Sequence, residues 1–160
     1  MAEKTDEDII KKEYPALQKK YSLPSIINIE NDFGVIEAEC EKYLLTNIRK
    51  KMNDKIEFFL EIISNIFEGE ATLSNIYESK VFDEEKKTEL FRIYKRLMRY
   101  SRQANVLSLT YDGLGEADFI NDFYKEWQSL KPAIKKNLAH FRDTWNSETD
   151  VSDDILNYLG

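Results

Sequence analysis

The sequence has 160 residues, a length typical of one domain that can bury a core of its own. With 5 Gly and 3 Pro among them, few residues break regular structure, so we expect long uninterrupted helices. One Cys and one His exclude a disulfide framework, a Cys/His zinc site within one chain and a haem-attachment motif. The net charge of -7 argues against non-specific binding of nucleic acid by the whole surface.

No segment of the sequence reads as an export signal or a membrane span. Residues 1–8 are acidic, whereas a signal peptide begins basic and then turns apolar, and Ala2 stands where myristoylation requires glycine. The most apolar stretch, residues 58–67, is interrupted by Glu61 and is half as long as a bilayer requires. We therefore expect a cytoplasmic protein without a membrane anchor, in which the lone Cys40 is not in a disulfide.

The first half of the chain predicts two helices separated by a loop. The first helix begins at Thr5 and ends before Pro24, because proline disfavours the helical conformation of the residue before it. A loop over residues 22–31 follows, and a helix over residues 32–68 then runs to Gly69. Its apolar positions recur every three or four residues, as in a coiled coil. We call them the seam: Leu45, Ile48, Met52, Ile56, Phe59, Ile63 and Ile66.

The second half predicts one short and three longer helices. A short helix follows Thr72, and a long one begins at Asp83 and continues towards Tyr111. Residues 107–111 also alternate as a strand would, so an extended segment stays open there. After a turn over residues 112–115, a fifth helix precedes a sixth that opens with Pro132 at its first position. The fifth is predicted to bury Phe119, Ile120, Phe123, Tyr124 and Trp127, and the sixth Ile134, Leu138, Phe141 and Trp145.

These elements predict a single all-α domain over residues 1–160, an elongated bundle of about five to seven helices. Its long members are the antiparallel helices over residues 32–68 and 83–111, and a short link makes the fifth and sixth helices antiparallel. A helix of this length would be about 50 Å long, whereas a compact domain of this size has a radius of gyration of about 15 Å. Residues 1–4 and 146–160 are predicted as flexible ends.

The residues that commonly carry catalysis are scarce and scattered. His140 lies about 120° round its helix from the apolar stripe, which predicts an ordinary histidine at the flank. Asp118, Asp122 and Glu126 are four residues apart on a side that should face water, which favours a solvated face over a metal site. We expect no cofactor, metal or catalytic residue, and only an activity of carboxylates with a divalent metal stays open.

One helix carries a concentration of positive charge. Five cations spaced three, one, three and three residues apart share a face of about 120° opposite the buried stripe. We call them the basic ridge: Arg92, Lys95, Arg96, Arg99 and Arg102. Tyr94 and Tyr100 turn away from this face, so the stacking surface of a single-strand reader is missing. Three interpretations of the ridge stay open: a solvated face paired with nearby carboxylates, a docking site for an acidic protein segment, or a contact to nucleic acid.

The C-terminal end is a second candidate for binding. Asp153 and Asp154 precede a short apolar stretch that forms an amphipathic turn or two if it is helical. The apolar residues that would dock are Ile155, Leu156, Tyr158 and Leu159. They could seat on the chain's own bundle or on a partner, and their acidic neighbours complement the basic ridge. We expect the tail to dock near the ridge, within the chain or between copies of it.

The sequence thus predicts a non-enzymatic helical module for protein–protein interaction or scaffolding. Its contact with a partner protein, or with a second copy of itself, would use the basic ridge or the seam. The alternative is a regulatory protein that contacts nucleic acid through the same ridge, which the net charge of -7 makes the less favoured partner.

Overall fold

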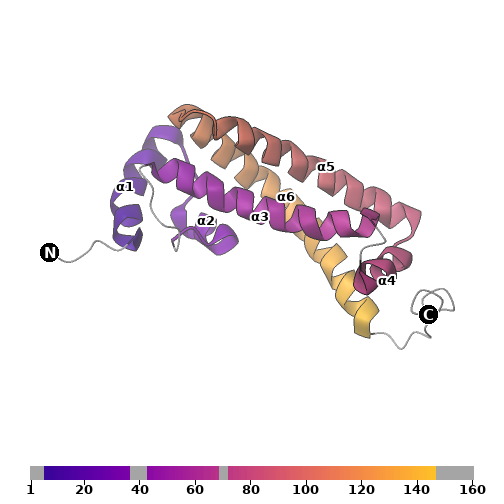
Figure 1. Cartoon of the computed structure of the whole chain (residues 1–160). Helices are drawn as coiled ribbons and strands as arrows, with labels where there is room; N and C mark the ends of the chain where they lie inside the picture. The colour runs from indigo at the N-terminus through magenta and orange to yellow at the C-terminus, as the bar shows by residue number, and fades with distance from the viewer. Residues whose placement is uncertain (1–5, 37–42, 69–71, 147–160) are drawn as a thin grey trace.

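The computed structural model describes residues 6–36, 43–68 and 72–146, and all the regular structure in these ranges is helical. The helices form an elongated bundle, which confirms the predicted all-α architecture (Figure 1). They are α1 (Asp6–Tyr21), α2 (Ile26–Phe33), α3 (Leu44–Glu68), α4 (Leu73–Val81), α5 (Glu84–Leu107) and α6 (Gly113–Asn146).

Three long helices make the body of the molecule. In Figure 1, α3 and α5 lie side by side and run antiparallel, joined at one end by the short α4, and α6 returns along them. The short α1 and α2 lie at the other end, where α3 begins. The predicted antiparallel pair is therefore present, and α6 adds a third long member.

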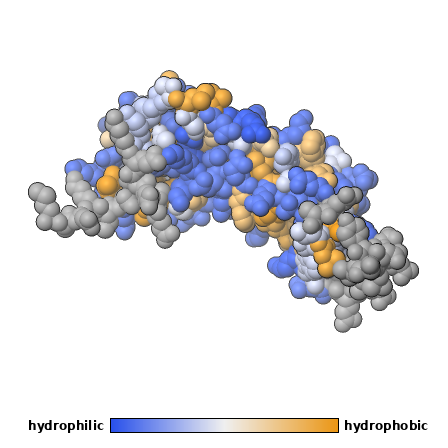
Figure 2. All heavy atoms as spheres, viewed as in Figure 1, coloured by the Kyte–Doolittle hydropathy of each residue, from blue (hydrophilic) through white to orange (hydrophobic). Residues whose placement is uncertain are grey.

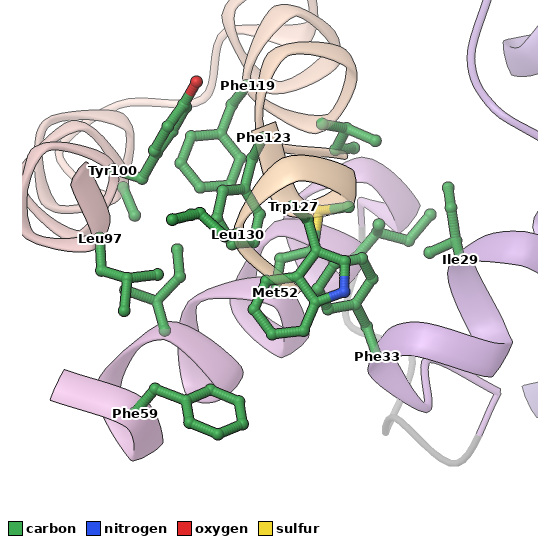
Figure 3. Packing of buried hydrophobic residues seen from close by; sticks show 14 of the residues in the cluster. Ile29, Phe33, Met52, Phe59, Leu97, Tyr100, Phe119, Phe123, Trp127 and Leu130 are labelled. Carbon is green, nitrogen blue, oxygen red and sulfur yellow. The ribbon is translucent and has the colours of Figure 1, made fainter. Parts of the chain in front are cut away.

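The seam is the centre of the core. All seven of its side chains are buried, and Met52 and Ile56 have no exposed surface. Opposite them, α6 contributes Phe119, Phe123 and Trp127, whose rings pack in succession at centroid distances of 5.9 and 6.0 Å (Figure 3). Because the seam is filled by neighbouring helices of the same chain, it offers no surface to a partner.

The predicted loop over residues 22–31 is wrong, because most of it belongs to α2. Ser25 caps this helix by accepting a hydrogen bond from the backbone N–H of Asn28, at 3.3 Å. Gly34 ends it in the left-handed region, at a φ of 62° that costs glycine little. The predicted start of the next helix at residue 32 is wrong for the same reason, since α3 begins only at Leu44.

The predicted pair of antiparallel helices after residue 115 is also wrong, because α6 is one helix of 34 residues. Pro132 lies inside it with an exposed side chain, so the carbonyl it leaves without an intrahelical donor lies on the side open to water. Buried apolar side chains keep a spacing of three or four residues across the proline, from Trp127 and Leu130 to Ile134. The spacing of these apolar residues is the signal in the sequence that indicates one continuous helix, whereas Pro132 indicates a new start.

The other predicted boundaries agree closely with the structure. Thr72 and Asp83 cap α4 and α5, each accepting a backbone hydrogen bond from the residue three positions on. α5 ends at Leu107, and residues 108–112 form a turn and an irregular link, neither the helix continued to Tyr111 nor a strand. Thr5 and residues 1–4 lie outside the described ranges, as do residues 147–160.

Candidate functional site

The basic ridge forms one face of α5, as its spacing predicts. Arg92, Lys95, Arg99 and Arg102 are exposed and Arg96 is half-buried. The opposite side of the helix is buried in the core. The five cations therefore share a surface. Arg96 and Arg99 contact side chains of this protein, and the other three have no ion-pair partner among the described residues.

Arg96 is held by α6. Its Nε lies 2.6 Å from Glu126 Oε1, and its second guanidinium nitrogen donates to the hydroxyl of Ser129. The hydrogen bond from Arg96 lowers the pKa of Glu126, and the charges of Arg96 and Arg99 act in the same direction. Arg96 therefore ties α5 to α6.

Arg99 lies over the aromatic ring of its neighbour. The guanidinium carbon is 4.8 Å from the centroid of Tyr100, a cation–π arrangement, and one guanidinium nitrogen donates to the tyrosine hydroxyl at 3.1 Å. Tyr100 itself is buried against Phe119 and Phe123. Tyr94 is half-buried beside Phe91. Neither tyrosine offers an open ring beside the ridge for a base to stack on.

Arg92, Lys95 and Arg102 are the available part of the ridge. They form no ion pair with any residue of the described ranges, and their side chains are exposed. Two of the three are arginines, whose planar donors suit bidentate pairing with carboxylate or phosphate. These three are therefore the cations of the ridge that no described side chain holds, and Arg99 lies beside them on the ring of Tyr100.

The other candidates for chemistry are not brought together. His140 is half-buried at the flank of α6, where its ring meets Phe82 edge-on at a centroid distance of 5.0 Å. Asp118 and Asp122 are exposed, and Glu126 is engaged by Arg96. Within the described ranges, no three His, Cys, Asp or Glu side chains form a group that could hold a metal ion. Cys40 lies outside those ranges.

The structure contains a buried ion pair that the sequence does not predict. Arg49 of α3 and Glu116 of α6 meet at 2.6 Å, with side chains 3% and 1% exposed. Glu116 also accepts a hydrogen bond from Thr46, and Arg49 donates to the carbonyl of Ala104. The two residues are 67 positions apart, so helical periodicity gives no sign of their contact. The pair and its hydrogen bonds join α3, α5 and α6, so we assign it a role in the stability of the fold.

Four residues predicted to dock lie outside the described ranges, so their docking stays a prediction: Ile155, Leu156, Tyr158 and Leu159.

Comparison of the chain with known protein families, with curated proteins and with solved structures finds no match. In the described part of the chain, every helix is too short or too polar to cross a bilayer.

Proposed function

We propose that this protein is a non-enzymatic helical interaction module that binds an acidic segment of a partner protein through its basic ridge. The observation that carries the proposal is the exposure of Arg92, Lys95 and Arg102 on one helix face, without ion-pair partners among the described residues. Rigid α5 holds these donors in fixed spacing, which lowers the cost of ordering them when carboxylates bind.

The surroundings of the ridge favour a protein over nucleic acid. Glu126 flanks it on α6, and the protein as a whole carries a net charge of -7, so an extended phosphate backbone would meet repulsion close to the ridge. The neighbouring tyrosines supply no stacking surface. A short acidic segment needs only the three or four cations that are present. A second copy of this acidic chain is one partner of that kind.

The test is affinity capture from the native lysate with the full chain as bait, compared with the double variant Arg92→Glu and Arg102→Glu. Both residues are exposed, so the variant should keep its fold, which circular dichroism checks. We expect a stoichiometric protein that the wild type retains and the variant loses. The matched control is Lys12→Glu with Lys19→Glu, an equal charge change on exposed residues of α1.

Three results would contradict the proposal. Equal retention by the wild type and the ridge variant would remove the ridge from the interface. Loss in the α1 control as well would indicate general charge attraction. Nucleic acid retained by the wild type alone, with affinity that falls steeply with salt, would replace the protein partner with the nucleic-acid alternative. Arg96 is unsuitable for this test because its replacement would also break the contact with Glu126.

A further inference from the structure

The groove between α3 and α6 already holds one short helix of the chain. α2 lies there with Ile29 and Phe33, four residues apart, as its buried side chains. The Phe33 ring packs against Phe123 at 5.7 Å and Trp127 at 5.5 Å between centroids (Figure 3). The groove thus accepts a helix through apolar side chains at i and i+4, the spacing of an amphipathic helix.

The groove continues beyond the end of α2. Trp127 is the wall shared by the two parts, since Phe33 packs on one side of it and Phe59 on the other, at 5.8 Å (Figure 3). Past this wall a surface cavity of about 520 Å³ is lined mainly by apolar surface, including Ile134 and Leu138. On the face shown in Figure 2, hydrophobic surface gathers over the middle of the molecule and in smaller areas towards both ends, with hydrophilic surface between them.

The rim of this cavity is positively charged. Its basic residues are Lys55 of α3 and Lys131, Lys135 and Arg142 of α6. Among the described residues of the lining, Asp32 is the only acidic one, and Lys131 pairs with it. Arg142 also meets Asp143 at 2.9 Å, but both side chains are mostly exposed, so solvent weakens this pair. The cavity is therefore basic in a protein whose net charge is -7.

A second groove, between α3 and α5, provides an internal comparison. Its cavity of about 600 Å³ is also partly apolar, with Phe58, Tyr94 and Met98 in its lining. The charged residues of its lining, within the described part of the chain, are Asp54, Glu57 and Glu61, all acidic. The two grooves thus differ in the sign of their charge, so an acidic ligand would be attracted to the α3–α6 groove and repelled by the α3–α5 groove.

We propose that the α3–α6 groove, beyond α2, binds an acidic amphipathic helix of a partner protein. Apolar side chains at i, i+3 or i+4, and i+7 would enter between Phe59, Ile134 and Leu138, as those of α2 do on the other side of Trp127. Carboxylates along the edges of the helix would meet Lys55, Lys135 and Arg142. The cavity volume is within the range of about 300–1,000 Å³ typical of binding pockets.

This surface is separate from the basic ridge. Glu126, which meets the ridge, and Lys135, which edges the groove, are nine residues apart on α6. At about 100° per residue, nine residues place them on opposite sides of the helix. The groove is therefore a second binding surface beyond the proposed function, and variants can alter either surface alone.

The test uses a synthetic amphipathic peptide of about 14 residues, or four helical turns, as the probe. Leucines at i, i+3, i+4 and i+7 form its apolar side, and glutamates flank them. A second peptide has lysine in place of every glutamate, and a third is a scrambled form of the first. Binding to the full-length protein is measured by calorimetry and by the amide shifts of residues 131–142. We expect saturable binding of the first peptide alone, weaker at high salt.

Two double variants of equal charge change locate the binding. Lys135→Glu with Arg142→Glu reverses the rim of the groove, and we expect the affinity to fall by about tenfold or more, since like charges would then face each other. Arg92→Glu with Arg102→Glu reverses the ridge and should change the affinity by less than about twofold. All four residues are exposed, so both variants should fold.

Each contrary result overturns the proposal in a distinguishable way. Failure to saturate, or equal binding of the scrambled or the lysine peptide, would show that the groove does not select an acidic amphipathic helix. Loss of binding in the ridge variant alone would move the peptide to the ridge and leave the proposed function intact. If the groove variant shifts the amides of residues 153–159 without any peptide, the chain's own C-terminal residues occupy the groove.

Discussion

Arginines in this protein have different roles according to whether their side chains are buried. Arg49 is 3% exposed and is fully engaged by Glu116 and the carbonyl of Ala104, whereas Arg92 has no ion-pair partner within the described ranges and is exposed. A buried charge must be paired because its desolvation is costly. The same residue type therefore stabilises the fold in α3 and remains available for binding in α5.

Replacement of Arg49 by methionine should be strongly destabilising. Glu116 would keep its buried position with its charge uncompensated, and removing one partner of such a pair costs about 3–5 kcal/mol. Urea unfolding followed by circular dichroism measures the change. Arg92→Met is the matched control, and we expect it to change the free energy of unfolding by less than about 0.5 kcal/mol. A loss below about 1 kcal/mol for Arg49→Met would contradict the structural role of the pair.

The contact between Arg96 and Glu126 should make stability depend on pH in the acidic range. Its hydrogen bond lowers the pKa of Glu126 in the folded state below its ordinary value of 4.5. The unfolded chain thus binds the proton first, so the stabilisation is complete above about pH 4.5 and is lost as the pH falls towards the folded-state pKa. The difference in unfolding free energy between wild type and Glu126→Gln should shrink below pH 4.5. A difference that is constant with pH would be evidence against the pairing.

At the scale of helices, local signals set most boundaries, and packing decides the exceptions. α2 has only 8 residues, too few for an isolated helix, and is held by the contacts of Phe33 with α6. α6 continues through Pro132 because buried residues on both sides of the proline pack on the same core. In both places tertiary contacts outweigh the local preference of the chain.

The continuity of α6 predicts that Pro132→Ala stabilises the protein. Proline inside a helix removes one backbone hydrogen bond and costs up to about 3 kcal/mol relative to alanine. The Pro132 side chain is exposed, so its loss removes little packing. Thermal and urea unfolding should both show a gain in stability. If Pro132 instead opened a separate helix after a turn, the substitution would be neutral or destabilising.

At the scale of the whole molecule, one continuous core extends along an elongated bundle. The buried cluster runs from Ile10 of α1 to Phe141 of α6. α6 has 34 residues, which at about 1.5 Å per residue makes it about 50 Å long. The surface carries two basic areas, the ridge on α5, which meets α6 at Glu126, and the apolar groove between α3 and α6. The two areas are separated because Glu126 and Lys135 lie on opposite sides of α6.

Small-angle X-ray scattering checks this shape. A compact domain of 160 residues has a radius of gyration of about 15 Å, and we expect a clearly larger value with an asymmetric distance distribution extending past about 50 Å. A dilution series separates the shape of one chain from self-association. A radius near 15 Å with a symmetric distribution would contradict the elongated bundle.

The sequence by itself determined the helical class, the seam, the caps at Thr72 and Asp83 and the shared face of the ridge. Each of these depends on residues within a few turns of one another, so periodicity and capping chemistry are enough to predict them. The ridge was predictable as a face, but which of its cations are available was not.

Only the tertiary structure decided the features that join distant segments. Arg49 meets Glu116, 67 residues away, and Arg96 of α5 meets Glu126 of α6. The groove likewise forms where α3 and α6 contribute Lys55 and Lys135 to the lining of one cavity. Such contacts depend on how helices pack against one another. Local periodicity shows which face of a helix is buried, but it does not specify which residue of another helix will lie opposite.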